Sequence, residues 1–289
     1  MMRLVVISGL SGSGKSVALN MLEDLGWYCV DNIPAGLLQA LVGHTVRDEE
    51  PMYRRVAVGL DARNRAADLM AIPELVADLR RSGIKCDLVY LHASDDVLLR
   101  RYAETRRRHP LASEGLDLTE AIARERQLLE PLADTADLVV DTSAFSVHVL
   151  RELVRNRVEP RRDGRLSILF ESFGFKQGIP GDADFVFDAR TLPNPYWQPA
   201  LKALTGQDQP VVQFLESSPL VERLIADVIR LLEDWIPEYR RNNRGYLTVA
   251  IGCTGGQHRS VYVVERLAKH FATQQRDVQI RHLGLERRS

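Results

Sequence analysis

The sequence predicts an α/β protein whose first half is an open, doubly wound parallel sheet with helices on both faces. Three observations predict this class. From residue 1 to about residue 157, short apolar segments alternate with segments of helical periodicity. The apolar segments are continuous, as is typical of parallel strands covered on both faces. The first of them leads directly into a glycine-rich loop and then into a helix.

Each element of this first half has a local signal. Gly26 ends the first helix, Pro34 occupies the first turn of the second, and Gly83 follows the third. The expected strands are residues 4–7, 27–31, 55–60, 86–91 and 138–141. The expected helices are residues 17–25, 34–42, 66–81, 95–108, 118–132 and 146–157.

The second half breaks this rhythm. Proline, glycine and clustered charge at residues 159–165 are typical of a linker. We therefore expect one domain over residues 1–158, a linker over 159–165 and a smaller α/β domain over 166–289. The expected strands of the second domain are residues 166–171, 184–188, 247–252 and 278–282, and its expected helices are 219–235 and 259–271.

The composition excludes several classes of protein. The 289 residues are 27% charged with a formal net charge of −1, so any binding to nucleic acid requires a local basic patch. Three widely spaced cysteines without a C-x-x-C pair argue against a disulfide framework or a zinc site. No stretch approaches the length of a membrane span, and we expect a cytoplasmic protein with no membrane partner.

The glycine-rich loop fits the phosphate-binding pattern G-x-x-x-x-G-K-[ST] at every fixed position. Its residues are Gly9, Leu10, Ser11, Gly12, Ser13, Gly14, Lys15 and Ser16. The glycines let successive N–H groups point inward, and the following helix adds the positive end of its dipole. We expect Lys15 to reach the β- and γ-phosphates as a catalytic residue, and the Ser16 hydroxyl to bind Mg²⁺. A chance glycine turn is the alternative, which the flanking strand and helix disfavour.

Two aspartates at the ends of expected strands are candidates to complete this site. Asp61 follows the strand 55–60, where an acidic residue usually holds the water shell of Mg²⁺, and we expect it to be catalytic. Asp31 ends the strand 27–31, where P-loop kinases often place a substrate-binding acid. For each of them, a helix-capping or turn carboxylate is the alternative.

Arginines gather at the end of the expected helix 95–108. The run Glu104-Thr105-Arg106-Arg107-Arg108-His109-Pro110 resembles the lid of small P-loop kinases, in which arginines close over the transferring phosphate. A solvated basic helix end that complements the helix dipole is the alternative. No guanine-reading Asn-Lys-x-Asp motif is present, so no pattern sets the base preference.

A second glycine loop follows the expected strand 247–252 and opens a helix, which predicts another anion-binding cradle. Its residues are Cys253, Thr254, Gly255, Gly256, Gln257, His258, Arg259 and Ser260. The pattern C-x-x-x-x-x-R-S also fits the loop of cysteine phosphatases, in which a thiolate attacks phosphorus and the arginine clamps the oxygens. A loop that only binds phosphate needs the same glycines and arginine, and no general-acid aspartate loop is evident. We therefore favour binding and keep the phosphatase as an alternative.

Basic residues also cluster toward the C-terminus. Those we expect to bind RNA phosphates are Lys269, His270, Arg276, Arg281, His282, Arg287 and Arg288. A solvated basic helix face with a frayed tail is the alternative, because Glu265 and Glu286 dilute the charge.

Several of these motifs together resemble one family. The stretches GLSGSGKSVALN, YCVDNIP, DARN and ETRRRHPL in the first half, with FESFGFKQGIP, DADFVFDARTLPNPYW and GCTGGQHRSVYVVERLA in the second, are similar to the bacterial RapZ/YvcJ family of nucleotide-binding proteins. The resemblance covers nearly the whole chain.

This resemblance implies binding and slow hydrolysis of ATP and GTP, with Mg²⁺. It assigns ATP to the P-loop, residues 9–16, and GTP to a short D-x-R-N stretch. That stretch is Asp61, Ala62, Arg63 and Asn64. Asp61 can serve both this role and the Mg²⁺ role if a single site accepts either nucleotide.

For the second domain, the resemblance implies binding of small regulatory RNA and of a phosphorylated amino-sugar metabolite. The chain would then be an adapter that presents RNA to a ribonuclease and so tunes amino-sugar synthesis, and we expect a homo-oligomer. Two alternatives remain open: a small-molecule kinase with an accessory domain, and a cysteine phosphatase fused to a P-loop module.

Overall fold

The computed structural model describes residues 2–47, 50–105, 108–112, 116–158, 166–242, 244–273 and 277–286. It divides into two compact units, Met1–Pro160 and Arg161–Ser289, each of which is described by itself. The expected linker, residues 159–165, lies outside the described residues.

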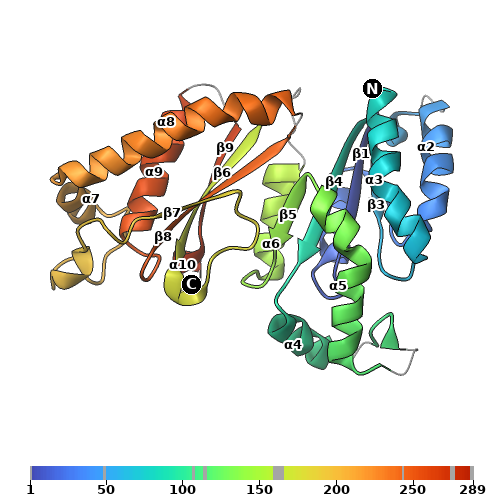
Figure 1. Cartoon of the computed structure of the whole chain (residues 1–289), viewed down its shortest axis with the longest axis horizontal. Helices are drawn as coiled ribbons and strands as arrows, with labels where there is room; N and C mark the ends of the chain where they lie inside the picture. The colour runs from blue at the N-terminus through green and yellow to red at the C-terminus, as the bar shows by residue number, and fades with distance from the viewer. Residues whose placement is uncertain are drawn as a thin grey trace. The chain divides into compact units, whose positions relative to one another are not determined.

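The first unit is built on a parallel sheet with the strand order β2-β3-β1-β4-β5, of which Figure 1 labels β3, β1, β4 and β5. Its strands are β1 (Arg3–Gly9), β2 (Tyr28–Val30), β3 (Arg55–Gly59), β4 (Lys85–His92) and β5 (Leu138–Asp141). Its α-helices are α1 (Lys15–Asp24), α2 (Leu38–Arg47), α3 (Ala66–Arg81), α4 (Asp95–Thr105), α5 (Leu118–Thr135) and α6 (Val147–Leu153). The prediction of a doubly wound parallel sheet is confirmed.

Helices cover both faces of this sheet because its central strands are apolar on both sides. Leu4 and Val6 of β1 share one core with residues of α2, α3 and α5. Val5 and Ile7, which point to the opposite face, are equally buried, and α1 packs against β1, β3 and α6. The expected last helix, 146–157, is α-helical only over α6 and continues as a π-helical turn, Val154–Val158.

The second unit holds a smaller parallel sheet with the order β7-β8-β6-β9. Its strands are β6 (Ser167–Gly174), β7 (Phe185–Asp188), β8 (Tyr246–Cys253) and β9 (Asp277–His282). Its α-helices are α7 (Gln209–Glu216), α8 (Pro219–Arg241), α9 (Arg259–Ala272) and α10 (Leu283–Glu286). Ile168 and Phe170 of β6 pack with α8 and α9 in one core. Helix α7 was not predicted; it begins with Gln209 and Pro210 and buries Val211 and Leu215.

The two sheets share one topology. When the strands of each unit are counted in chain order, four neighbours in both sheets read second, third, first, fourth. Ligands of open parallel sheets bind at the carboxyl ends of the strands, where the strand order reverses. The first glycine loop follows β1, the first strand of its sheet, and the second glycine loop follows β8, the third strand of its sheet. Both loops therefore lie at the edge where such ligands bind.

Within the described ranges, none of the helices has the length and apolar character that crossing a membrane requires.

Candidate nucleotide-binding site

The P-loop connects β1 to α1 through glycines that no other residue could replace without strain. Gly9 has φ +141°, and a Cβ there would lie 2.0 Å from the carbonyl oxygen of Leu91. Gly14 has φ +109° at the N-terminus of α1, where a Cβ would lie 2.5 Å from Leu150. The N-cap residue Gly14 supplies no side-chain cap, so the first turn of α1 presents its N–H groups at the loop.

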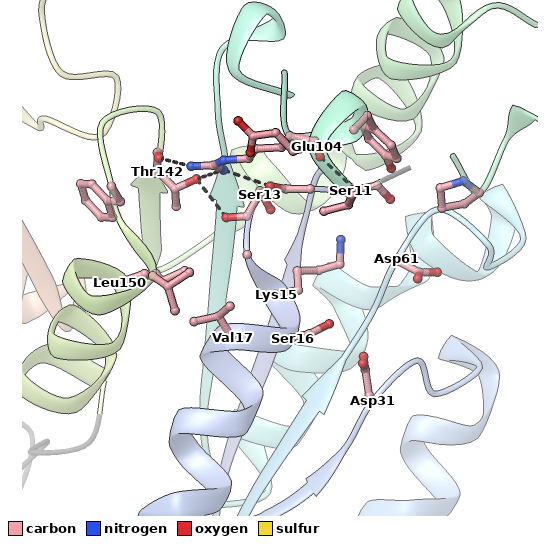
Figure 2. A pocket seen from close by; sticks show the side chains of 18 of the residues that line it. Ser11, Ser13, Lys15, Ser16, Val17, Asp31, Asp61, Glu104, Thr142 and Leu150 are labelled. Atoms are coloured by element: carbon pink, nitrogen blue, oxygen red, sulfur yellow. Dashed lines mark hydrogen bonds between the residues drawn. The ribbon is translucent and has the colours of Figure 1, made fainter. Parts of the chain in front are cut away.

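Lys15 is half-buried beneath this loop, and its Nζ donates a hydrogen bond to the carbonyl oxygen of Gly9 at 2.6 Å. Burial lowers the pKa of Lys15 below its ordinary value, and the negative charges of Glu125 and Asp61 oppose this shift. Figure 2 shows Lys15, Ser16 and Asp61 facing one pocket. The amine of Lys15 therefore lies at the wall of the pocket that the P-loop borders.

The pocket beside the loop has a volume of about 620 Å³, within the range of small-molecule sites. Besides the P-loop, its polar wall includes Asp31, Asp61 and Arg63, which lie at or beyond the carboxyl ends of β2 and β3. Its apolar wall is formed by Val17, Phe145, Val147 and Leu150. One side of the pocket thus suits phosphates with a metal ion, and the other suits a flat apolar ring.

The D-x-R-N stretch divides between this pocket and the interior. Asp61 is buried and accepts hydrogen bonds from Arg63 Nε at 2.9 Å and Nη2 at 2.6 Å. Both residues line the pocket. Ala62 is part of the apolar core, and the Asn64 side chain bonds to main-chain atoms of residues 33, 35 and 61. Neither Ala62 nor Asn64 is among the residues that line the pocket.

Two residues that the sequence analysis missed fasten the P-loop from one side. Arg101 of α4 donates to the carbonyl oxygen of Gly12 at 2.9 Å and to that of Thr142 at 2.7 Å. Thr142 Oγ1 donates to the carbonyl oxygen of Ser13 at 2.9 Å. These bonds hold the carbonyl oxygens of Gly12 and Ser13 in place and so fix the backbone of the P-loop at these two residues. Arg101 lies within α4 and belongs to no recognised sequence motif, so its role could not be predicted from the sequence.

A third missed residue, Glu125 of α5, holds the loop from another side. Its carboxylate accepts the main-chain N–H of Ser11 at 2.8 Å and the Ser11 hydroxyl at 2.6 Å. His109 Nε2 lies 3.2 Å from the same carboxylate. Of the predicted lid arginines, Arg108 lines the pocket, whereas Arg106 and Arg107 lie outside the described residues.

The residues present fit a Mg²⁺ ion bound together with nucleotide phosphates. Ser16 is exposed at the loop, and it shares the pocket with the carboxylates of Asp31 and Asp61. The Ser13 hydroxyl is buried and has no hydrogen-bond partner among the described residues. In the same part of the chain, no three His, Cys, Asp or Glu side chains gather as an ion site by themselves. Mg²⁺ is usually bound by one or two protein carboxylates together with substrate phosphates, and the oxygens of Ser16, Asp31 and Asp61 could supply the protein part of such a site.

The second glycine loop surrounds a buried thiol. Cys253, which is 3% exposed, lies 3.1 Å from the hydroxyl of Ser260. Burial would raise the pKa of the Cys253 thiol, but hydrogen bonds, chiefly from Ser260, and the charge of Arg259 outweigh burial and lower it. Arg259 is itself buried and donates to the carbonyl oxygens of Arg190 and Leu192.

The remaining residues of this loop divide between surface and interior. Thr254 is exposed and Gly255 has open space where a Cβ would stand, while Gly256 is buried with φ +71°. The His258 ring is buried, with Nε2 3.2 Å from the carbonyl oxygen of Leu201, and Gln257 is half-buried. The exposed Thr254 and the half-buried Gly255 form the part of the loop that an anion could approach.

Of the predicted RNA-binding residues that the structure describes, Lys269 is exposed, His270 and His282 are half-buried and Arg281 is buried. Arg281 is 8% exposed and pairs with the carboxylates of Glu171 and Asp182, so its charge is directed inward. This placement corrects the expectation of an exposed phosphate contact, and its cause is the buried acid on β6 opposite β9.

The two predicted RNA-binding histidines each have an acidic neighbour. The His282 ring contacts Ser172 at 2.8 Å and Glu265 at 3.0 Å, and His270 lies 3.0 Å from Glu233. Lys269 is exposed on α9. Arg276, Arg287 and Arg288 lie outside the described residues.

The fold and the first loop together define a class: a P-loop protein with a nucleotide-binding domain on a parallel sheet. Comparison with known families places the chain more narrowly. A model of the RapZ-like N-terminal domain matches residues 2–162, and a model of the RapZ C-terminal domain matches residues 166–286. The chain belongs to the RapZ family.

Relatives over the full length agree with this assignment. A nucleotide-binding protein of Pseudoalteromonas atlantica is 56% identical over 99% of this chain and 100% of its own length. A nucleotide-binding protein of Alkalilimnicola ehrlichii is 54% identical over 99% of each chain.

Solved structures are more distant. A shikimate kinase from Bacteroides thetaiotaomicron is 14% identical, with a TM-score of 0.37 over 55% of this chain and 99% of that chain. A gluconokinase from Sinorhizobium meliloti is 20% identical, with a TM-score of 0.34 over 52% and 87% of the two chains.

Proposed function

We propose that the first unit binds ATP and GTP with Mg²⁺ and hydrolyses them slowly, and that the second unit binds a phosphorylated amino sugar and small regulatory RNA. The chain then acts as an adapter that presents the RNA to a ribonuclease and so tunes amino-sugar synthesis. The observation that carries the nucleotide part is the pocket in which Lys15, Ser16 and Asp61 meet beneath the P-loop. The RNA and metabolite parts rest on membership of the RapZ family.

The residues of the first unit have separate roles in this proposal. Lys15 neutralises the terminal phosphates, and the first turn of α1 supplies N–H donors to them. Mg²⁺, when bound, neutralises developing charge on the phosphates. Ser16 and Asp61 hold the ion or its water shell. Arg63, which pairs with Asp61, and Arg108 bring two further cations to the pocket wall.

Nucleotide binding is tested by replacing Lys15 with alanine. We expect ATP and GTP affinity to fall about tenfold or more, since charge-assisted hydrogen bonds contribute about 1.5–3 kcal/mol each. Lys85→Ala, at an exposed lysine in the same unit, is the matched control and keeps full affinity. A Lys15→Ala protein that binds ATP as tightly as the wild type would refute the phosphate-loop proposal.

A second experiment distinguishes hydrolysis of the nucleotide from transfer of its terminal phosphoryl group to a small molecule. Slow release of phosphate to water, unchanged by small hydroxylated acceptors, supports the regulatory role. Rapid transfer to such an acceptor would instead favour a small-molecule kinase.

The second unit is proposed as a binding module rather than a phosphatase. The thiol of Cys253 is 3% exposed, and Arg259 donates to main-chain carbonyl groups. Cys253→Ser is therefore expected to keep the affinity for a phosphorylated amino sugar, which calorimetry measures. Phosphate release from that sugar by the wild type, lost in Cys253→Ser, would support the phosphatase.

The RNA proposal is tested in cells by crosslinking the protein and sequencing the RNA bound to it. We expect enrichment of small regulatory RNA, and we expect Lys269→Glu to reduce this enrichment. Binding of the same RNA to the purified protein should weaken as the salt concentration rises. Finding no enriched RNA would contradict the adapter role.

A further inference from the structure

Glu125 is a fully buried carboxylate on a helix face that is otherwise apolar. Its exposure is 0%, and its neighbours on that face of α5 are Ala121, Ile122, Leu129 and Leu132. Burying a carboxylate is unfavourable unless hydrogen bonds and opposite charge compensate it. The role of this residue therefore depends on what its oxygens hold.

Both carboxylate oxygens hold the P-loop. Oε2 accepts the main-chain N–H of Ser11, and Oε1 accepts the Ser11 hydroxyl. His109 supplies the third donor, because its Nδ1 accepts the main-chain N–H of Leu111 at 3.1 Å, which leaves the proton on Nε2 facing Glu125. Burial would raise the pKa of Glu125, but the bonds from His109 and Ser11 and the charge of Lys15 outweigh burial and lower it.

The same carboxylate acts on the phosphate-binding lysine. Among the charged groups that act on Lys15, Glu125 is the one that most favours its protonated form. The influence is mutual, since Lys15 favours the ionised form of Glu125. One buried acid thus fixes the backbone at Ser11 and supports the charge at Lys15.

We propose that Glu125 is a positioning residue for nucleotide binding, which holds Ser11 and thereby shapes the P-loop, and that His109 ties it to residues 108–112. Arg108 and Pro110 of that segment line the same pocket as the P-loop. The acid therefore joins the loop that receives phosphate to the wall that carries Arg108. This inference rests on the proposed nucleotide binding at the P-loop.

Glu125→Gln separates this role from simple volume. The amide has nearly the same shape. With its NH₂ group at the Oε2 position it would face two donors, the Ser11 N–H and the Nε2–H of His109; at the Oε1 position it would face the Ser11 hydroxyl, which would have to turn and accept instead of donating. The wild-type arrangement, in which the carboxylate accepts all three donors, cannot be kept in either orientation, and the charge that strengthens these bonds is lost. Loss of the negative charge also removes support for protonated Lys15. Glu130→Gln is the matched control, because Glu130 is exposed on the same helix.

The experiment measures the dissociation constant of a fluorescent ATP analogue with Mg²⁺, and the melting temperature without ligand, for full-length proteins. We expect Glu125→Gln to weaken binding about tenfold or more while the protein remains folded, and Glu130→Gln to match the wild type. Ser11→Ala should weaken binding less, and its effect should be much smaller in the Glu125→Gln background, because the two changes break one contact.

The outcomes separate the two proposals. A wild-type protein that fails to bind the analogue refutes the proposed function itself. A folded Glu125→Gln protein with wild-type affinity overturns the positioning role while the proposed function stands. Additive effects of Ser11→Ala and Glu125→Gln would also overturn it.

His109→Gln decides the matter if Glu125→Gln does not fold. Glutamine keeps a donor for Glu125 but cannot accept the N–H of Leu111 in the same way. We expect weaker analogue binding, and we expect Arg108→Ala to have less effect in this background than in the wild type. Unchanged affinity in a folded His109→Gln protein would overturn the link to residues 108–112.

Discussion

Asn64 Oδ1 accepts the main-chain N–H of Ala35 at 2.6 Å, and Asn64 Nδ2 donates to the carbonyl oxygens of Ile33 and Asp61. A single side chain therefore ties the turn after β3 to the segment that leads into α2. The hydrogen bonds of this amide are made to the protein backbone, which makes Asn64 a structural residue of the D-x-R-N stretch.

Asn64→Ala is expected to destabilise the first unit by about 1–3 kcal/mol, because it removes the hydrogen-bond partner of the buried residue Ala35. ATP and GTP affinity should then fall together if they change at all. Denaturation in urea and nucleotide titration measure the two effects. Loss of GTP binding alone, at unchanged stability, would show that Asn64 reads the nucleotide.

ATP and GTP are expected to displace one another. Asp61 and Arg63 line the same pocket as the P-loop, while the side chains of Ala62 and Asn64 are directed into the apolar core and to main-chain atoms. The wall formed by Val17 and Leu150 contacts a ring through apolar side chains, which favour adenine and guanine alike. Competition titrations with a fluorescent analogue should give one site per chain for both nucleotides. Simultaneous binding of ATP and GTP would contradict a shared site.

Gly9→Ala and Gly43→Ala should have opposite effects on stability. A Cβ at Gly9 meets the main chain at Leu91, where nothing can give way, and φ is +141°. A Cβ at Gly43, inside α2, meets nothing within 4 Å. We expect Gly43→Ala to stabilise the protein by about 0.5–1 kcal/mol and Gly9→Ala to destabilise it by more than that. Thermal unfolding of the two variants checks the difference, and equal melting temperatures would contradict it.

Stability in acid should report on Glu125. Its folded-state pKa lies below the ordinary value of 4.5, so its ionised form contributes stability at neutral pH, and this contribution is lost as the pH falls through the folded-state pKa. The gap in unfolding free energy between the wild type and Glu125→Gln should therefore be constant near pH 7 and shrink below about pH 4.5. Urea unfolding across this range tests it, with Glu130→Gln as the control. A difference in unfolding free energy between the wild type and Glu125→Gln that grows as the pH falls would contradict this prediction.

Arg281→Ala should destabilise the second unit, because Arg281 pairs with carboxylates inside the protein. The guanidinium lies between the carboxylates of Glu171 and Asp182, whose side chains are 0% and 3% exposed, and removing one partner of a buried ion pair costs about 3–5 kcal/mol. Lys269→Ala, at an exposed position, should leave stability within about 0.5 kcal/mol. Calorimetric melting of both variants distinguishes them, and an unchanged Arg281→Ala melting curve would contradict the buried network.

Much of the first unit could be predicted from the sequence, because its signals are local. A few neighbouring residues are enough to recognise the continuous apolar strands, the glycines of the P-loop and the acid after β3. The helix α7 escaped prediction because it is short and its two buried residues, Val211 and Leu215, span only about one turn.

The missed residues share a different cause. Glu125 stands between Arg124 and Arg126, a run that is typical of a solvated, charge-laced helix. Its register with Ala121 and Leu129 places it on the core face, and that spacing was the available signal. Arg101 and Arg281 depend on partners far away in sequence, Gly12 and Glu171, which no local pattern joins.

The pairing of strands has a practical consequence. Every strand ladder among the described residues joins strands of one unit, from β1 with β3 and β4 to β6 with β8 and β9. A chain cut between residues 158 and 166 would therefore keep both sets of ladders whole. Expressing the halves separately, alone and mixed, turns this topology into a complementation assay. Assays of each half then test the proposed binding of ATP and of RNA separately, without altering a single side chain.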